Sequence, residues 1–447
     1  MSELTGREVA FRVLGGYRRD RTRPETALYA LCEKYGVSER ETALAARIIN
    51  GVLQNMAFCD YVASFYSTIE LKKLEPRLLD VLRISIYQIV FLTKIPHSAA
   101  VNEGVALAKK HSNPRAAGLV NAVLRRLSTD AATGSLPEIT YEDAYQRLSV
   151  KYSHPEWLVR QFCSLLGMDG GEALLKTNNS SDTPITAQVN TLRADVATVV
   201  SSLASDGVEV SCHEWLDDCI YLYAPGKVER LSAFKKGLFF IQDAASRLAI
   251  IAAEPKPGEF VIDACAAPGG KSFASAIMMK NTGRIAAFDI AAAKLSQIRD
   301  GAARLGISIA DTAEKDAARH DNEFAGKADI VLADVPCSGF GVIRNKPDVR
   351  YKSQSDIAGL PDIQKAILTN ISSYVKPGGT LLYSTCTVLK QENEYVVEEF
   401  LSMNPEFSPS GFNLPGIGQV PDGMITLWPH IHGTDGFFIC KLKKRRL

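Results

Sequence analysis

Residues 259–280, EFVIDACAAPGGKSFASAIMMK, decide the predicted fold of the C-terminal half of the chain. A short apolar run ends at Asp263, and Pro268, Gly269 and Gly270 then permit a tight turn before a second apolar stretch with helical spacing. A strand that enters a helix through such a turn can bring its backbone close to a small molecule. The turn lacks the GxGxxG and GxxxxGKS/T spacings, which weighs against dinucleotide and ATP binding.

Strand-like and helix-like apolar runs alternate from about residue 237 to the end of the chain. The strand-like runs are EFVIDAC, IAAFDI, DIVLADVP and GTLLYSTC, and each is followed by a run with helical spacing. This alternation predicts an open, doubly wound, Rossmann-like α/β domain over residues 237–447. Ligands of such sheets bind at the carboxyl ends of the strands, so polar residues at those ends are the candidates for function.

The N-terminal half of the chain has a different pattern. At about 150 residues per domain, 447 residues leave room for roughly three domains. Apolar residues recur at helical spacing up to about residue 127, and residues 128–137 have linker composition, which predicts an all-α domain over residues 1–137. Residues 138–236 are predicted to form linker helices and a small α+β segment.

Charge and cysteine content bound the possible partners. Lys and Arg number 51 against 50 Asp and Glu, so nucleic acid would have to bind a local basic patch. Residues 1–150 hold 20 basic and 16 acidic residues, with basic clusters at residues 18–23 and 125–126, which solvated helix faces would also explain. The chain shows neither a signal peptide nor an apolar run of ~18 residues, which predicts a cytoplasmic protein that does not enter a membrane. Nine cysteines without CxxC spacing predict no disulfide framework and no metal site.

Two acidic residues follow the next strands of the predicted sheet. Asp289 ends the second strand, where a carboxylate can accept hydrogen bonds from a ribose diol. Asp316 comes after the third strand and could meet an adenine amino group, although a solvated loop aspartate fits the sequence equally well. Together with the glycine-rich turn, Asp289 indicates a nucleoside-type cofactor.

Two cysteines lie at the ends of neighbouring predicted strands. The run DIVLADVPCSGFGVIRNKPD leads from a strand through Asp334 to Cys337 and a loop with Arg344 and Lys346. The run YSTCTVLKQENE places Cys386 after the next strand and Glu392 at the start of the following helix. A single cysteine in such a place is usually an inert apolar residue. Two of them beside a cofactor turn indicate thiol chemistry.

The three motifs together resemble those of bacterial 16S ribosomal RNA cytosine-5 methyltransferases of the RsmB type, also called Fmu or Sun. DACAAPGGK is similar to their S-adenosylmethionine loop, and the other two are similar to their Pro-Cys and Thr-Cys motifs. PHSAAVNEGVALAK and GLVNAVLRR resemble parts of the NusB-like RNA-binding domain that is fused to these enzymes. The resemblance covers nearly the whole chain.

The resemblance implies transfer of a methyl group from S-adenosylmethionine to C5 of a loop or unpaired cytosine in 16S ribosomal RNA, by a monomer. It implies that Cys386 is the nucleophile, that Cys337 helps to release the product, and that Asp334 borders the methyl donor and the target base. The residues that it implies for cofactor binding are Cys265, Ala266, Ala267, Pro268, Gly269, Gly270, Lys271, Asp289, Asp316 and Asp334.

Three alternatives remain open at the level of sequence. The same chemistry could act on transfer RNA, because the catalytic motifs do not specify the RNA. A noncatalytic RNA-binding assembly factor could keep the fold, although the two cysteines argue against it. DNA cytosine-5 methyltransferases use the Pro-Cys cysteine as nucleophile, so a DNA substrate would make Cys337 the attacking residue.

Overall fold

The computed structural model describes residues 4–180 and 183–446, which form two compact units. Unit 1 contains the chain up to residue 180 together with the later segment Ile343–Tyr351. Unit 2 contains residues 183–342 and the chain from Lys352 onwards. Within these described ranges, no helix is both long enough and apolar enough to cross a bilayer.

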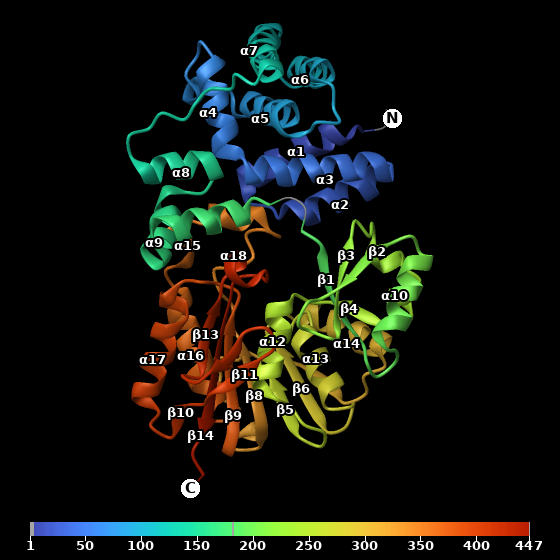
Figure 1. The fold of residues 1–447 in the computed structure, drawn as a ribbon, viewed down its shortest axis with the longest axis vertical. Coiled ribbons are helices and arrows are strands. Elements are labelled where there is room, and N and C mark those ends of the chain that lie inside the picture. The colour runs from blue at the N-terminus through green and yellow to red at the C-terminus, as the bar shows by residue number, and fades with distance from the viewer. Residues whose placement is uncertain (1–3, 181–182, 447) are drawn as a thin grey trace. The chain divides into compact units, whose positions relative to one another are not determined.

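Unit 1 is helical, as its apolar periodicity predicts (Figure 1). Several helices begin after a residue whose side chain caps them. The cap side chain accepts a hydrogen bond from a backbone N–H in the first turn, as at Thr5, Ser38, Asn113 and Asp143. Its helices are α1 Gly6–Asp20, α2 Pro24–Tyr35, α3 Glu39–Gln54, α4 Met56–Tyr66, α5 Pro76–Phe91, α6 His97–His111, α7 Pro114–Thr133, α8 Ala144–Tyr152 and α9 Glu156–Asn178, with short 3₁₀ turns at Leu71–Lys73 and Pro347–Tyr351.

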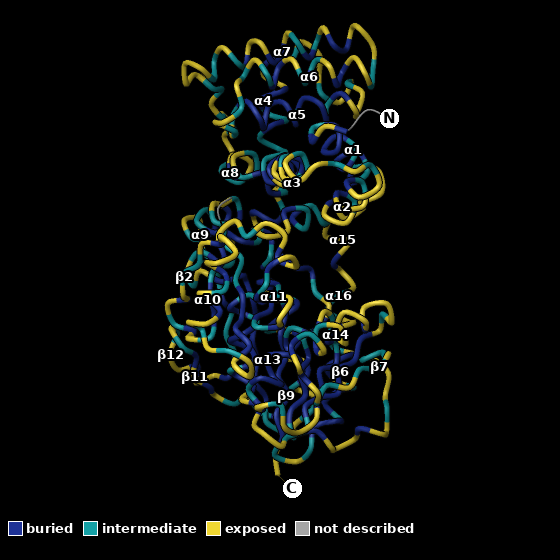
Figure 2. The backbone as a smooth tube through the Cα atoms, turned by 90° about the vertical axis from the view of Figure 1, so that its right-hand side faces the viewer, coloured by how far each residue is buried: buried dark blue, intermediate teal, exposed yellow. Residues whose placement is uncertain are grey.

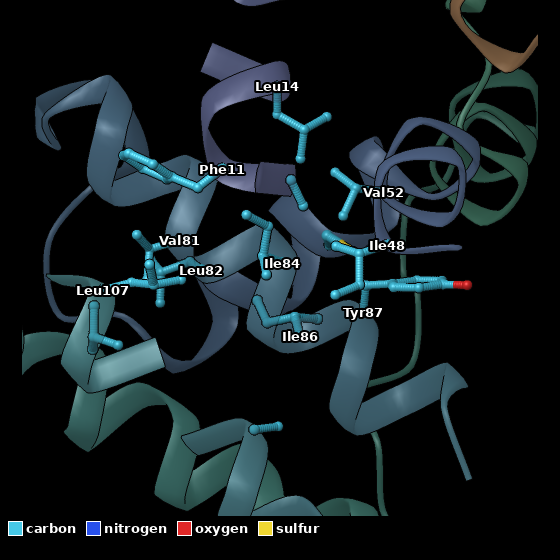
Figure 3. Packing of buried hydrophobic residues seen from close by; sticks show 14 of the residues in the cluster. Phe11, Leu14, Ile48, Val52, Val81, Leu82, Ile84, Ile86, Tyr87 and Leu107 are labelled. Carbon is cyan, nitrogen blue, oxygen red and sulfur yellow. The ribbon is translucent and has the colours of Figure 1, made fainter. Parts of the chain in front are cut away.

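The core of unit 1 comes from the apolar faces of these helices. Figure 3 shows side chains of α1, α3, α5 and α6 meeting there, among them Phe11, Ile48, Leu82 and Leu107. Asp130 accepts a hydrogen bond from the hydroxyl of Tyr66 and belongs to α7, which continues to Thr133. The predicted linker therefore loses its first residues to this helix, because a polar stretch at a helix end carries no apolar signal.

Unit 2 begins with a small antiparallel sheet whose strand order is β2-β3-β1-β4. Its strands are β1 Ile185–Val189, β2 Glu209–Cys212, β3 Cys219–Tyr223 and β4 Phe239–Ile241, and helix α10 Val196–Ser205 packs on them. The α+β segment is thus present as predicted, and β4, which the sequence did not predict, pairs with β1.

The large sheet of unit 2 has the order β10-β14-β9-β8-β5-β6-β7. The central strands β5 Phe260–Asp263, β6 Arg284–Asp289, β7 Ala310–Glu314, β8 Ala328–Asp334 and β9 Val375–Thr385 are parallel. Strand β14 Phe437–Lys444 pairs antiparallel with β9, and β10 Phe407–Pro409 and β13 Met424–Leu427 pair with β14. Strands β11 Phe412–Leu414 and β12 Gly418–Val420 form a separate hairpin.

Helices cover both faces of this sheet (Figure 1). Alternate strand residues point to opposite faces, so Ile262 and Val331 pack with α16 Leu360–Ser372 and α17 Glu394–Met403. Val261 and Leu332 pack on the other face with α12 Ala244–Ala253, α13 Gly270–Met278 and α14 Ala292–Leu305. Figure 2 shows the chain through this sheet as mostly buried. The predicted doubly wound α/β architecture is confirmed, with an added antiparallel edge.

Candidate active site

The glycine-rich turn between β5 and α13 forms the floor of the candidate site. Gly269 has φ +112° directly before α13, a conformation that L side chains rarely adopt, and a Cβ there would lie 2.4 Å from the Phe273 ring. A Cβ on Gly270 would lie 3.2 Å from Nε2 of the buried Gln242. The glycines therefore keep the backbone open at the start of a helix, where free N–H groups favour an anionic ligand.

The other residues of the turn are held by the strands around it. The N–H of Ala267 donates to Asp289 Oδ2 at 3.2 Å, and the N–H of Ala266 donates to the carbonyl of Phe288. The Ala267–Pro268 peptide bond is cis. Cys265 lies within the turn, where burial raises the pKa of its thiol. The structure thus places residues 265–269 in one turn beside the end of β6 and residues 270–271 at the start of α13.

Asp316 lines a separate cavity of about 140 Å³ at the carboxyl ends of β5 and β6. Ala264 and Phe288 supply apolar walls, and Lys315 and Arg319 supply polar ones. Asp316 also pairs with Arg319 at 3.3 Å and caps the N–H of Ala318. A small cavity with one apolar wall and an aspartate at its edge is suited to a flat heterocycle that carries an amino group.

An ion pair joins the cofactor turn to the end of β8. The Lys271 ammonium donates to Asp334 Oδ2 at 2.7 Å, and the hydroxyl of Ser384 donates to Asp334 Oδ1 at 2.9 Å. Lys271 is buried and lies 5.0 Å from the centre of the Phe437 ring. Asp334 and Ser384 are partners in the β8–β9 register, so neighbouring strand ends position this group.

The two predicted cysteines meet at these strand ends. The Sγ atoms of Cys337 and Cys386 lie 3.0 Å apart, and both residues are partly exposed. The N–H of Gly341 donates to the Cys386 carbonyl at 2.9 Å. A Cβ on Gly341 would lie 2.8 Å from the Cys386 carbonyl and 1.8 Å from the carbonyl of Gly436, directly before β14, so only glycine allows the Pro-Cys loop to approach both segments this closely.

The surroundings of Cys337 disfavour its thiolate. The hydrogen bond with Cys386, burial, and the negative charges of Cys386, Glu392 and Asp334 together raise the pKa of the Cys337 thiol well above its usual range. Burial likewise raises the pKa of Asp263, at the end of β5, to about 6. The site is therefore rich in acidic groups.

Residues that the sequence did not single out for chemistry hold the two cysteine loops. Glu392 Oε2 accepts from the N–H of Ser338 at 2.8 Å and from Gln364 Nε2 at 3.0 Å. The hydroxyl of Ser338 donates to Thr387 Oγ1 at 2.8 Å, so the residues after both cysteines are joined. The sequence predicts that Glu392 opens a helix. In the structure, Glu392 is the last residue of the 3₁₀ turn Lys390–Glu392 and its side chain is buried, and α17 begins at Glu394.

Family models match most of the described chain. The model described as "16S rRNA methyltransferase RsmB/F" matches residues 250–443, which include the cofactor turn and both cysteines. A Bacillus subtilis protein named "Probable ribosomal RNA small subunit methyltransferase B" is 36% identical over 100% of both chains. The chain belongs to this family of 16S rRNA methyltransferases.

Further matches agree with this family along the whole chain. The NusB family model matches residues 5–129, and a ferredoxin-like domain model of RsmF/B-like methyltransferases matches residues 154–229. A Vibrio cholerae protein named "Ribosomal RNA small subunit methyltransferase B" is 31% identical over 92% of this chain and 91% of its own. The solved structure titled "Crystal Structure of PH0851" is 28% identical, with a TM-score of 0.80 over 99% of this chain and 100% of that one.

The two basic residues that follow the Pro-Cys motif belong to a different unit from the two cysteines. Arg344 and Lys346 follow the Pro-Cys motif in sequence, but they lie in Ile343–Tyr351, which packs within unit 1. In the described part of the chain, no group of three or more His, Cys, Asp or Glu side chains gathers as metal ligands would.

Proposed function

We propose that this protein methylates C5 of an unpaired cytosine in 16S ribosomal RNA, through a transient bond between Cys386 Sγ and C6 of the base. The observation that carries the proposal is the 3.0 Å contact of two thiols beside the Lys271–Asp334 ion pair. Membership in a family of 16S rRNA methyltransferases supports the choice of RNA.

S-adenosylmethionine, which supplies an electrophilic methyl group when bound, fits the residues of the turn. Residues 265–271 would line it, with the open N-terminus of α13 toward its carboxylate. Asp289 would hold the ribose, and Asp316 would meet the adenine at the edge of the apolar cavity. The buried Asp263 Oδ1 and Gln242 Oε1, which have no hydrogen-bond partner within the described chain, support a polar ligand at this place.

Cytosine C5 is a poor nucleophile, and covalent catalysis makes it more reactive. Attack of the Cys386 thiolate on C6 forms the S–C6 bond and makes C5 enamine-like, so that C5 can accept a methyl group. Loss of the C5 proton to water then returns the electron pair of the S–C6 bond to Cys386 and restores the aromatic ring. Cys337, in contact with Cys386, would assist this release.

Attack at C6 also places negative charge on N3 and O2 of the base. Both oxygens of Asp334 already accept hydrogen bonds, so the proton that offsets the charge on N3 would come from the Lys271 ammonium, which Asp334 holds in place. A hydrogen bond that strengthens in the transition state lowers the barrier.

Unit 1 would hold the RNA through its exposed arginines. Arg18 is tied to Asp80 at 3.0 Å, which leaves the exposed Arg19, Arg21 and Arg23 and the pair Arg125 and Arg126 for phosphate contacts. We assign RNA binding to residues 1–137, RNA positioning to residues 138–236 and methyl transfer to residues 237–447. Extruding the target cytosine costs least where it is already unpaired.

Cysteine variants test the chemistry. Cys386→Ala is expected to lower methyl transfer from labelled S-adenosylmethionine to 16S RNA by on the order of 10⁴-fold or more, because the attacking atom is gone. Cys337→Ala is expected to accumulate a protein–RNA adduct that survives denaturing electrophoresis. Retained methylation by Cys386→Ala, with no adduct in Cys337→Ala, would contradict the assigned roles.

A second assay tests the substrate. Labelled S-adenosylmethionine is offered with undermodified 16S RNA, transfer RNA and plasmid DNA, and the labelled nucleoside is identified by digestion and chromatography. We expect 5-methylcytidine from 16S RNA alone. Label confined to transfer RNA or DNA, or a different methylated nucleoside, would overturn the proposed substrate.

A further inference from the structure

Glu392 is a carboxylate with no exposed surface beside the two cysteine loops. Its Oε2 accepts two hydrogen bonds, and both donors are neutral: the Ser338 N–H and the Gln364 amide. Its other oxygen, Oε1, is buried without a hydrogen-bond partner in the described part of the chain. Burying an acid so incompletely is costly, which suggests that the group has a task besides packing.

The position of Glu392 is fixed relative to Cys337. Ser338, which directly follows Cys337, donates its N–H to Glu392, and Gln364 Nε2 also donates to the carbonyl of Pro336 at 2.9 Å, directly before Cys337. The hydroxyl of Tyr383 donates to the backbone carbonyl of Glu392 at 2.5 Å. Hydrogen bonds with Ser338 and Gln364 therefore hold the Glu392 carboxylate against the residues on either side of Cys337.

Two thiols in contact cannot both ionise readily, because the second charge would form next to the first. Which sulfur loses its proton depends on the charges around each one. The hydrogen bond with Cys386, burial and the charge of Cys386 raise the pKa of Cys337 most, and Glu392 and then Asp334 raise it further. The charged group of opposite sign at this loop is the Lys352 ammonium, which donates to the Ser338 carbonyl at 2.6 Å. A buried negative charge acts strongly here because little solvent screens it.

We propose that Glu392 is a positioning residue that keeps Cys337 protonated, so that its S–H donates to Cys386 and Cys386 alone reacts as the thiolate. This inference rests on the proposed function. In it, Glu392 determines which of the two cysteines reacts as the thiolate. The S–H···S hydrogen bond stabilises the Cys386 thiolate before attack and again when the S–C6 bond breaks. No proton leaves Cys337 in either event.

Thiol alkylation tests the proposal without RNA or S-adenosylmethionine. The full chain is treated with iodoacetamide between pH 6 and pH 10, and the labelling rate of each cysteine is read by peptide mass spectrometry. Wild-type protein is expected to label at Cys386 far faster than at Cys337. Glu392→Gln, which keeps the shape but loses the charge, is expected to raise the Cys337 to Cys386 labelling ratio at pH 8 by about tenfold, the effect of one pKa unit.

Two further variants separate charge from packing. Glu392→Asp keeps the negative charge and is expected to leave the ratio close to that of the wild type, although it shortens the side chain. Glu398→Gln removes an exposed acid from α17 and is the matched control, with no expected change. An equal ratio in wild type and Glu392→Gln, or faster labelling of Cys337 in the wild type, would overturn the proposal. Because the readout needs no turnover, loss of the proposed methylation would not mimic this result.

Discussion

The two units each bury a full charge, and they do so in opposite ways. Arg350 in unit 1 and Glu392 in unit 2 both have no exposed surface, and both are surrounded by neutral partners. The Arg350 guanidinium donates to backbone carbonyls and one side-chain amide, of residues Gln54, Tyr152, Ser153, Asn178 and Asn179. Glu392 has two donors on one oxygen and none on the other among the described residues.

Helix geometry explains the five acceptors of the Arg350 Nη1 and Nη2 groups, whereas its Nε is buried without a hydrogen-bond partner among the described residues. Gln54, Tyr152 and Asn178 are the last residues of α3, α8 and α9, whose carbonyls lack partners within their own helices. Three helix C-termini carry partial negative charge, which a cation offsets. Burial lowers the pKa of Arg350 to about 10, so the group remains charged at neutral pH.

The difference between the two sites separates a structural charge from a functional one. Arg350 completes the hydrogen bonding of three helices, so its removal should act on stability. Glu392 accepts a hydrogen bond from the residue that follows Cys337, so its removal should act on reactivity. The predictions below follow this contrast.

The largest stability effect is expected from Arg350→Met. This change removes the guanidinium donor from four backbone carbonyls, of which those of Gln54, Tyr152 and Ser153 keep a donor in Asn179 or Tyr351. Because a buried hydrogen-bond network is broken, we expect unit 1 to lose ~3–5 kcal/mol of stability. Hydrogen exchange in the full chain should show faster exchange in α3, α8 and α9. The exposed Arg115 of α7 offers the control Arg115→Met, for which a change below about 0.5 kcal/mol is expected. Equal exchange in the two variants would show that the carbonyls do not need Arg350.

Asp263 provides an intermediate case with a pH signature. Its pKa of about 6 in the folded state exceeds the ordinary value of 3.8, so folding favours the protonated acid. Stability from this group is full below about pH 4 and is lost as the pH rises through 6. The Asp263→Asn variant has no carboxyl group to ionise. Its free energy of unfolding relative to that of the wild type should therefore rise by up to about 3 kcal/mol between pH 4 and pH 7.

Denaturant unfolding of unit 2 at several pH values measures this gain. Asp300→Asn, at an exposed position on α14, is the matched control and should show no such trend. A difference between Asp263→Asn and wild type that does not vary with pH would mean that Asp263 is ionised throughout.

The smallest stability effect is expected from Glu392→Gln. The amide can still accept from Ser338 and Gln364, and the oxygen that it replaces has no partner, so the change should stay within about 1 kcal/mol. Urea unfolding monitored by hydrogen exchange in the β8 and β9 peptides measures it. A loss as large as that of Arg350→Met would erase the contrast between the two buried charges.

Local sequence patterns predicted the parts of the molecule that depend on local rules. The ends of β5, β6, β8 and β9 could be placed because each apolar run stops at a polar residue. The contact between the Cys337 and Cys386 thiols follows once β8 and β9 are neighbours. The roles of the two thiols came from resemblance and stay predictions.

The remaining features depend on contacts between distant residues. Strand β14 lies beside β9 although 51 residues separate Thr385 from Phe437, and nothing in its apolar run specifies an antiparallel direction. Arg350 reads as an ordinary loop base, because its five acceptors come from helices about 170 to 300 positions earlier in the chain. Glu392 reads as a helix-opening acid, because the 3₁₀ turn that buries it has no apolar period of its own.

The identity of the atom that bonds to the RNA is the central claim, and peptide mapping measures it directly. Cys337→Ala protein is incubated with 16S RNA and S-adenosylmethionine, the adduct is digested with protease and nuclease, and the modified peptide is sequenced by mass spectrometry. We predict a methylated cytidine nucleotide attached to the peptide that contains Cys386. Attachment to any other residue, or methylated RNA produced by a protein that lacks the Cys386 sulfur, would contradict the account.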